Sequence, residues 1–411
     1  MWLQHTSVRE RRTLLAGFLG YGVDGFDFMI YTFIIPTLLT AWSMTRAEAG
    51  NIATAALLTS AMGGWAAGIL ADRFGRVRML QLTILWFAVF TFLSGFTHTY
   101  AQLLFTRGMQ GFGFGGEWSV GSVLVAETIE ARHRGKAAGL VQSSWALGWA
   151  AAAISFWGVY TLVPPALGWK ILFWMGIAPA LLVLYIRRGV EESPAYLSGR
   201  ISRAASGSAS YLNIFRPQLL RTTVWASLLS CGMLGAYYSV TTWLPTYLKV
   251  ERHLSVTGTS AYLLVVIGGS FAGYLMSAWL SDALGRRRCF MLFAVCGMLL
   301  IVAYTRLPIT DGEMLFLGFP LGFFLSGIFS GMGAFLTELY PTAVRGSGQG
   351  FCYNFGRAVG AICPALIGAW SAHGSLRLAI GAMTVAAYAL VIVAAWALPE
   401  TGGRALIADS A

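Results

Sequence analysis

The sequence predicts an all-α membrane protein of twelve transmembrane helices, arranged as two six-helix pseudo-repeats. Of its 411 residues, 57% are hydrophobic and only 11% are charged, and the mean hydropathy is +0.66. A soluble domain carries about 25% charged residues. The apolar residues form continuous runs of about 20 residues, which as helices cross a bilayer core of ~30 Å, and not the alternating strands of ~10 residues found in barrels. Loop motifs of the first half also recur in the second half.

The apolar runs between charged residues and Pro or Gly breaks place the individual spans. The twelve spans are expected at 13–39, 50–71, 77–97, 101–126, 137–159, 169–187, 219–247, 258–281, 289–307, 313–338, 347–369 and 376–398. No small-residue cleavage site follows the first span, so it is not expected to be a signal peptide. The polar stretch 188–218 is expected to be a central loop between an N-terminal half, 1–187, and a C-terminal half, 219–411.

The basic residues predict the orientation in the membrane. Of the 28 Lys and Arg residues, twenty fall in alternate loops on one side and six on the other. The positive-inside rule then places both termini and the central loop in the cytoplasm, in a multi-pass protein of the cell (inner or plasma) membrane. Because the net charge of +11 is spread over these loops and not gathered in one patch, we do not expect nucleic acid as a partner. The expected partner is the lipid bilayer, and the protein is expected to be a monomer. The remaining two, Arg107 and Arg357, lie within spans.

Two loop motifs recur at almost the same distance along the chain. The segment 68–78, which follows span two, is matched by 280–288 after span eight, 210 residues later. Glu127 and Arg134 after span four are matched by Glu338 and Arg345 after span ten, 211 residues later. Repeated halves around a midplane binding site are a transporter architecture.

The loop after span two resembles the signature loop of the major facilitator superfamily. The segments 191–194 and 399–401 resemble motifs of sugar:proton symporters, whereas 24–28 and 116–118 are most similar to the sialate:proton and organic-acid:proton symporter families. The resemblance covers the whole chain and implies a major facilitator fold. The span-seven motif of yeast-type lactate transporters, a related group, is absent from this sequence.

Ten charged or glycine residues at the cytoplasmic ends of spans are candidates for a gate that closes this side. They are Asp72, Arg73, Gly75, Arg76, Glu127, Arg134, Asp282, Arg286, Glu338 and Arg345. Glu127 and Glu338 are expected to pair with Arg134 and Arg345. Ala283 stands where the first loop has Arg73, which predicts a weaker second gate. The alternative is that these arginines only determine topology.

Ionisable residues inside spans are costly unless paired or functional. Asp24 and Asp27 share a face of span one, and by helix rise Asp27 and Arg107 both lie about 9 Å below the outer surface. The resemblance implies that Asp27 pairs with Arg107 and carries the proton; a static ion pair is the alternative. Glu117 is either a second proton site, a substrate-side polar group or a packing residue.

A carboxylate site is predicted around Arg357, which lies about 15 Å into span eleven by helix rise. A guanidinium binds a carboxylate through two parallel hydrogen bonds, and Tyr353 and Asn354 share its helix face. Other polar residues are candidates for substrate contact, with plain helix packing as the alternative. These residues are Gln142, Trp145, Trp149, Tyr238, Thr241 and Thr242.

No cofactor or metal is expected. The five cysteines lack metal-ligand spacing, and the glycine pattern at 111–116 lies in a helical span, where it lets helices pack, and not after a strand. There is no P-loop and no nucleophile–base constellation, so the proton gradient is the expected energy source and an enzyme is not expected.

We interpret the sequence as a proton-coupled symporter importing a small organic anion, such as a mono- or dicarboxylate or sialic acid, by alternating access. A drug or metabolite exporter of this fold, and a neutral sugar or polyol:proton symporter, remain alternatives.

Overall fold

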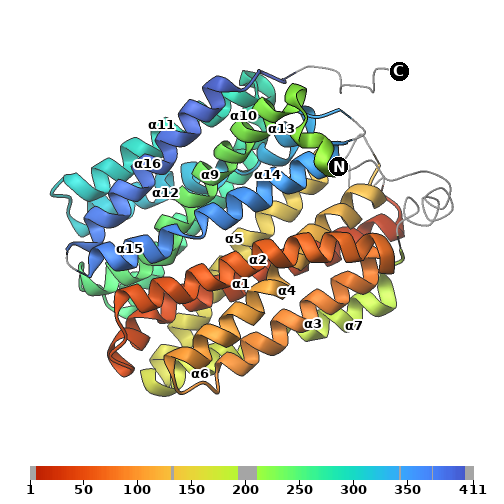
Figure 1. Ribbon diagram of the computed structural model, residues 1–411. Helices are drawn as coiled ribbons and strands as arrows, with labels where there is room; N and C mark the ends of the chain where they lie inside the picture. Colours follow the sequence, from red (N-terminus) through yellow and green to blue (C-terminus); the bar gives the residue numbers. More distant parts are fainter. Residues whose placement is uncertain (1–5, 131–133, 193–210, 342–343, 373, 403–411) are drawn as a thin grey trace. The chain divides into compact units, whose positions relative to one another are not determined.

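The computed structural model describes residues 6–130, 134–192, 211–341, 344–372 and 374–402, and most of these are helical (Figure 1). The helices of the first half are α1 (Val8–Ala41), α2 (Arg46–Phe74), α3 (Arg76–Ser94), α4 (Tyr100–Thr128), α5 (Arg134–Leu162), α6 (Pro165–Met175) and α7 (Pro179–Gly189). After the short 3-10 helix η3 (Tyr211–Phe215) follow α9 (Pro217–Val250), α10 (Val256–Leu284), α11 (Arg286–Arg306), α12 (Asp311–Gly327), α13 (Met332–Glu338), α14 (Arg345–Gly360), α15 (Cys363–Ser371) and α16 (Leu376–Ala397).

Three of the predicted spans are not continuous helices. The sixth is divided into α6 and α7, the tenth into α12 and α13, and the eleventh into α14 and α15. Pro179 and Pro364 stand in the first turn of α7 and α15, where the missing N–H of proline costs no hydrogen bond within the helix. No proline lies between α12 and α13, where the break falls in a segment with Gly327 and Gly331. Each of these three predicted spans therefore consists of two helices joined by a short break.

Within the described residues, ten helical segments are long and apolar enough to cross a membrane by themselves. The two spans outside this set are α4 and the pair α14–α15. These are the spans that carry Arg107, Glu117 and Arg357. Together the segments make the twelve spans that the sequence predicts.

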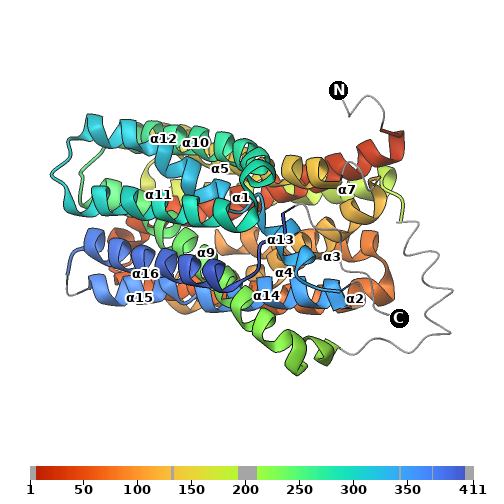
Figure 2. The same cartoon turned by 90° about the horizontal axis from the view of Figure 1, so that it is seen from above.

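The contacts between Cα atoms divide the chain into two units. The first unit contains 1–44 and 51–208, and the second contains 45–50 and 209–411. In the first unit, α1 packs on α4 and α5, and α3 packs on α4 and α7 (Figure 1). In the second unit, α9 packs on α14 and α16, and α10 packs on α12 (Figure 2).

Glycines bring the backbones of paired helices together at matching places in the two halves. A Cβ added at Gly111 of α4 would lie 2.0 Å from the carbonyl oxygen of Ala56 in α2. In the second half, a Cβ at Gly322 of α12 would lie 1.8 Å from the carbonyl oxygen of Val266 in α10. Both distances exclude any side chain, so the glycine pattern at 111–116 serves close helix packing, as predicted.

Candidate functional site

Asp27 of α1 lies at the centre of a buried polar cluster in the first unit. The hydroxyl of Thr91 in α3 donates to its Oδ1 over 2.6 Å, and the amide of Gln110 in α4 donates to its Oδ2 over 2.5 Å. Nη1 of Arg107, also in α4, lies 3.4 Å from both carboxylate oxygens. The structure thus brings together the two charged residues that helix rise placed at one depth.

The Arg107 side chain is enclosed by aromatic rings as well as by its counter-ion. It is 2% exposed, and its guanidinium carbon lies 5.5 Å from the ring centres of both Tyr31 and Phe173. Removing two charges from water is costly unless they pair, and ring faces attract a guanidinium. Because the hydrogen bonds from Thr91 and Gln110 are shorter than the contacts to Arg107, neutral donors position the Asp27 side chain.

An aromatic cluster joins α1, α4 and α5. The indole ring of Trp145 lies 5.1 Å from the ring of Tyr21, 5.8 Å from that of Phe28 and 6.2 Å from that of Phe114. Such separations are typical of stabilising ring pairs. Trp145 is therefore a packing residue of the first unit as well as a candidate substrate contact.

Two other predicted residues of α5 have buried polar atoms without hydrogen-bond partners. Among the described residues, nothing accepts from Nε1–H of Trp149, which is fully buried, and nothing donates to Oε1 of Gln142. A buried polar group without a partner costs about 1–3 kcal/mol. These two atoms are therefore places where a water molecule or a solute would be stabilised.

Glu117 and Asp24 are both buried in the first unit. Glu117 is 2% exposed and Asp24 is 0% exposed. Oε1 of Glu117 would lie 2.2 Å from a Cβ added at Gly20 of α1. The absence of a side chain at Gly20 is what lets this carboxyl group reach α1, a constraint that the sequence pattern alone does not reveal.

Arg357 is the centre of a second cluster, in the second unit. It is 3% exposed, its Nη2 donates to the Tyr353 hydroxyl over 3.2 Å, and its guanidinium carbon lies 4.9 Å from the Tyr353 ring centre. Tyr238 of α9 also hydrogen-bonds to it. Asn354 donates to the carbonyl of Gly350, and within the described chain its Oδ1 has no donor. The cluster therefore combines a buried cation with phenols and one open amide oxygen.

The two predicted threonines of α9 differ in what their hydroxyls do. The Thr241 hydroxyl donates to the carbonyl of Tyr237 over 2.8 Å, within its own helix. That bond uses its only proton, so helix packing explains this residue. The Thr242 hydroxyl is buried and has no partner among the residues that the structure defines, so it remains a candidate contact.

A charged cluster joins α3, α4 and the segment after α7 at one end of the first unit. Nε and Nη2 of Arg76 each lie 3.2 Å from a carboxylate oxygen of Glu127, which is a forked ion pair. Glu192 accepts from the backbone N–H groups of Arg76 and Val77 over 3.0 and 3.2 Å. It thereby caps α3, whose N-cap is Gly75 with φ of 102° and no side chain to do so.

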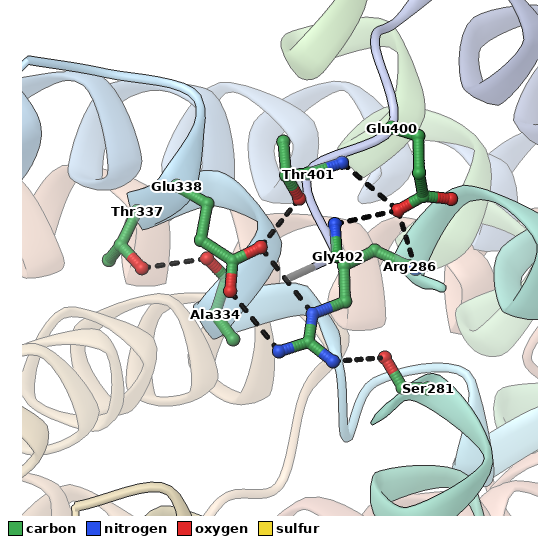
Figure 3. Close-up of polar contacts among 8 residues, drawn as sticks. All are labelled: Ser281, Arg286, Ala334, Thr337, Glu338, Glu400, Thr401 and Gly402. Atoms are coloured by element: carbon green, nitrogen blue, oxygen red, sulfur yellow. Dashed lines mark hydrogen bonds and ion pairs between the residues drawn. The ribbon is translucent and has the colours of Figure 1, made fainter. Parts of the chain in front are cut away.

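The same arrangement recurs in the second unit (Figure 3). Nη2 of Arg286 lies 3.2 Å from Oε1 of Glu338, and Glu400 accepts from the backbone N–H groups of Arg286 and Arg287 over 2.9 and 3.1 Å. The Thr401 hydroxyl donates to Glu338 over 2.5 Å, an addition that the figure shows beside the ion pair. The repeat detected in the sequence therefore extends to three-dimensional contacts.

The partner predicted for Glu338 was wrong. Glu338 pairs with Arg286 of α11, whereas Arg345 donates to the carbonyl of Thr337 over 3.0 Å. Arg73 is exposed, 5.6 Å from the ring centre of Phe74. The side chains of Asp72, Arg134 and Asp282 lie outside the described residues.

Two effects act in opposite directions on the pKa of the Glu400 carboxyl. Burial raises this pKa, whereas hydrogen bonds from the backbone N–H groups of Gly402, Arg286, Arg287 and Thr401 lower it. The hydrogen bonds have the larger effect, so the pKa lies below the ordinary glutamate value of 4.5. A lowered pKa means that the carboxylate stabilises the folded state above pH 4.5. This stabilisation is lost as the pH falls through the lower pKa of the folded protein.

Glu400→Ala is therefore expected to destabilise the second unit at neutral pH by about 1–2 kcal/mol, the usual cost of removing a helix cap. Thermal unfolding in detergent at pH 7 and at pH 4 measures this, with Glu191→Ala, whose side chain is 72% exposed, as control. The difference from the parent should shrink at the lower pH. A loss that is the same at both pH values would mean that the carboxylate charge plays no part.

Among the described residues, no group of three or more His, Cys, Asp or Glu side chains could hold a metal ion.

A family model for the Major Facilitator Superfamily matches residues 17–310 and 266–406. The chain is also 41% identical to a protein of Cupriavidus pinatubonensis named "Probable 4-methylmuconolactone transporter", over 98% of this chain and 94% of that protein. It is 30% identical to a "Cis,cis-muconate transport protein" of Acinetobacter baylyi, over 94% of each chain.

Among solved structures, a crystal structure of a D-xylose–proton symporter is similar to the model. Its TM-score is 0.73, at 20% sequence identity, and the alignment covers 97% of this chain and 100% of that one. At this identity, the likeness concerns the fold and not the solute.

Proposed function

Because the chain belongs to the Major Facilitator Superfamily, we propose that it is a proton-coupled symporter that imports a small organic anion by alternating access. The family and the fold class predicted from the sequence are confirmed, and the protein is a multi-pass membrane transporter and not an enzyme. The observation that carries the proposed substrate class is the buried guanidinium of Arg357 among phenols in the second unit.

A carboxylate is the ligand that best fits this guanidinium. Arginine presents two parallel N–H donors that match the two oxygens of a carboxylate. Its neighbours Tyr353 and Tyr238 supply hydroxyl groups, and Asn354 supplies an amide. Muconate, which the relative from Acinetobacter is named for, is a dicarboxylate, and this supports the same class of substrate here.

Asp27 is the proposed proton carrier. Its carboxylate is fully buried and has one cationic neighbour, Arg107, at 3.4 Å. When Asp27 takes up a proton, its attraction to Arg107 is lost, while the hydrogen bonds to Thr91 and Gln110 can keep the side chain in place. A carboxyl group that changes charge without losing its position can load a proton on one side of the membrane and release it on the other.

We also propose the inner membrane as the location, with both termini in the cytoplasm, since the basic loops lie on that side. The clusters around Arg76 and Arg286 follow α2 and α10, at ends expected to face the cytoplasm. In this proposal they form the gate, because a forked, half-buried ion pair holds helix ends in one arrangement.

Arg76→Gln is expected to shift the protein toward a state open to the cytoplasm. The shift can be measured as faster maleimide labelling of Gly350→Cys in a cysteine-free background, in inside-out vesicles. Gly350 lies on the face of Asn354, and a Cβ added there meets no atom within 4 Å. Arg73→Gln, an exposed arginine of the same loop, is the control. Equal labelling in all three proteins would mean that the loop with Arg73 and Arg76 determines membrane topology and does not form a gate.

Uptake into proteoliposomes tests the proposed function as a whole. The panel should contain cis,cis-muconate, 4-methylmuconolactone, sialic acid and nicotinate, with D-xylose as a neutral solute, each with and without an inward pH gradient. We expect accumulation of at least one acid only with the gradient. Accumulation of the sugar alone would favour the sugar symporter, and gradient-driven loss of solute from the vesicles would favour an exporter.

A further inference from the structure

The two carboxylate oxygens of Asp27 accept hydrogen bonds from donors of different kinds. Oδ1 accepts from the Thr91 hydroxyl over 2.6 Å, and Oδ2 accepts from the Gln110 amide over 2.5 Å. All three side chains are buried, with exposed fractions of 0–2%. Arg107 lies 3.4 Å from both oxygens and does not distinguish them. The two neutral donors are therefore what makes the oxygens different.

The two donors differ in whether they can also accept a hydrogen bond. A hydroxyl has one proton to donate and lone pairs with which to accept, whereas an amide nitrogen only donates. When Asp27 takes up a proton, the oxygen that carries it becomes a donor and needs an acceptor. At Oδ1, Thr91 can become that acceptor if its own proton turns to another group. At Oδ2, the new O–H would meet another donor, unless the whole Gln110 amide group rotated by half a turn.

The surroundings of Thr91 allow this reversal by the movement of one hydrogen atom. In a helix, a threonine hydroxyl can donate to the carbonyl three or four residues earlier, and Thr83 of the same helix donates to Leu80 over 3.1 Å. The methyl group of Thr91 is held against Gly176, where an added Cβ would lie 2.2 Å from it. The side chain is therefore fixed with its oxygen at Asp27, while the direction of its O–H bond can change.

Helix packing alone does not require these polar groups. Counted from the first residue of each helix, α1, α3 and α4 correspond to α9, α11 and α12 of the second half. At the places of Asp27, Thr91 and Gln110, the second half has buried apolar residues, which are Ala236, Ile301 and Leu321. The first half therefore has a polar cluster at positions where the same helices in the second half carry apolar side chains.

We propose that the transported proton binds to Oδ1 of Asp27 and that the Thr91 hydroxyl then accepts the hydrogen bond from it. This inference rests on the proposed role of Asp27 as the proton carrier, and it names the residue that assists it. One O–H bond forms at Oδ1, and its proton comes from a hydronium ion on the side to which the cluster is open, which leaves water. The Thr91 proton turns to a backbone carbonyl of α3, and Gln110 keeps its bond to Oδ2.

The charged surroundings of Asp27 are the same in every variant that tests this proposal. Within the described residues, Arg107 is the one charged group in contact with Asp27. Residues 79–94 of α3 and 137–159 of α5 contain no titratable side chain. Further titratable groups on α1, α4, α6 and α7 include Tyr21, Asp24, Tyr31, Glu117, Lys170 and Tyr185. None of these is changed, so a difference in pH dependence between variants comes from the substituted hydrogen-bonding group.

Proton uptake by Asp27 in the purified protein tests the proposal without a substrate. Infrared difference spectra between acidic and alkaline pH show the carbonyl bands of protonated carboxyl groups, and the band that is lost in Asp27→Asn reports Asp27. Gln110→Leu removes a donor that serves only the ionised form, so the midpoint of this band should move to higher pH by about one unit. Thr91→Val removes a donor from the ionised form and an acceptor from the protonated form, so its midpoint should move less than half as far. The parent's midpoint should persist in Thr91→Ser, which keeps the hydroxyl, and in Thr83→Val, whose hydroxyl bonds within its own helix.

The size of the shift in Thr91→Val decides between the two roles of this hydroxyl. A shift at least half as large as that of Gln110→Leu would mean that Thr91 only donates, and would overturn the proposal. The position of the band is a second test that does not need the Gln110 variant. In the protonated protein, loss of the acceptor should displace the Asp27 band in Thr91→Val but not in Thr91→Ser, and an undisplaced band would also overturn the role of Thr91. If no band depends on Asp27, this residue takes up no proton, and the proposed proton carrier fails together with this inference.

Discussion

Replacing Arg357 with alanine is expected to weaken binding of the transported acid by roughly 2–5 kcal/mol, the cost of losing a buried charged contact. Arg357→Lys should also weaken binding sharply although it keeps the charge, because an ammonium cannot form the forked pair with a carboxylate. It also cannot keep the planar contact with the Tyr353 ring, now 4.9 Å from the guanidinium carbon. We therefore expect both variants to bind the acid more weakly than the parent, and the alanine variant to lose more affinity than the lysine variant.

The measurement is the affinity of the parent and of both variants for the acid and for its amide. The parent should bind the acid much more tightly than the amide, and the variants should bind the two alike. Arg306→Lys is a suitable control, because Arg306 is exposed at the end of α11. If the lysine variant binds the acid normally, Arg357 is not the carboxylate site. That result would favour a sugar symporter or an exporter of this fold.

Replacing Asp27 with asparagine is expected to abolish uphill uptake while leaving exchange of solute across the membrane intact. An asparagine is nearly the same size and can still accept from Thr91, so the cluster of α1, α3 and α4 should keep its packing. It cannot take up a proton, and it leaves Arg107 without the charge that lies 3.4 Å away. The expected result is a transporter that equilibrates its solute but no longer concentrates it.

Counterflow and gradient-driven uptake in the same proteoliposomes separate these two activities. Asp311→Asn provides the control, because Asp311 pairs with Arg252 at an exposed helix end, with a side chain 57% exposed. An Asp27→Asn variant that still concentrates substrate under a pH gradient would make Asp27 a structural residue. Loss of counterflow together with uptake would indicate a folding defect.

The equal depths of Asp27 and Arg107 could be predicted because the rise of a helix fixes depth, and the resemblance to the sugar symporters implied that the two residues pair. Two charged residues at one depth in neighbouring spans have few other partners. Thr91, which makes one of the shortest contacts to Asp27, could not be predicted. Its role depends on which face of α3 meets α1, and an apolar helix gives no pattern for that choice.

Sequence proximity was misleading for the charged clusters. Glu338 was expected to pair with Arg345, seven residues later, but its ion pair is with Arg286. Arg345 does lie close by, but its guanidinium donates to the backbone carbonyl of Thr337, while the Glu338 carboxylate pairs with Arg286 of α11. By contrast, the first half shows the matching pair, Arg76 with Glu127, and the repeat could have transferred that partner to the second half.

The buried hydrogen bond from the Ser326 hydroxyl to the Ser270 hydroxyl was also missed. Serine is common in membrane helices as a packing residue, and its hydroxyl carries no charge that marks it out. A signal was nonetheless present in the sequence. Aligning the halves places Ser326 opposite Gly115, and this change from glycine to serine marks a hydroxyl that the first half lacks.

The central claim is that an organic anion and a proton move together. A pH-sensitive dye inside proteoliposomes tests it when cis,cis-muconate is added outside without a pH gradient, with protein-free liposomes to correct for passive entry of the acid. Inward movement of the acid should acidify the interior, and the Asp27→Asn variant should give no acidification. Entry of the acid without any change of internal pH, or equal acidification with Asp27→Asn, would contradict the account.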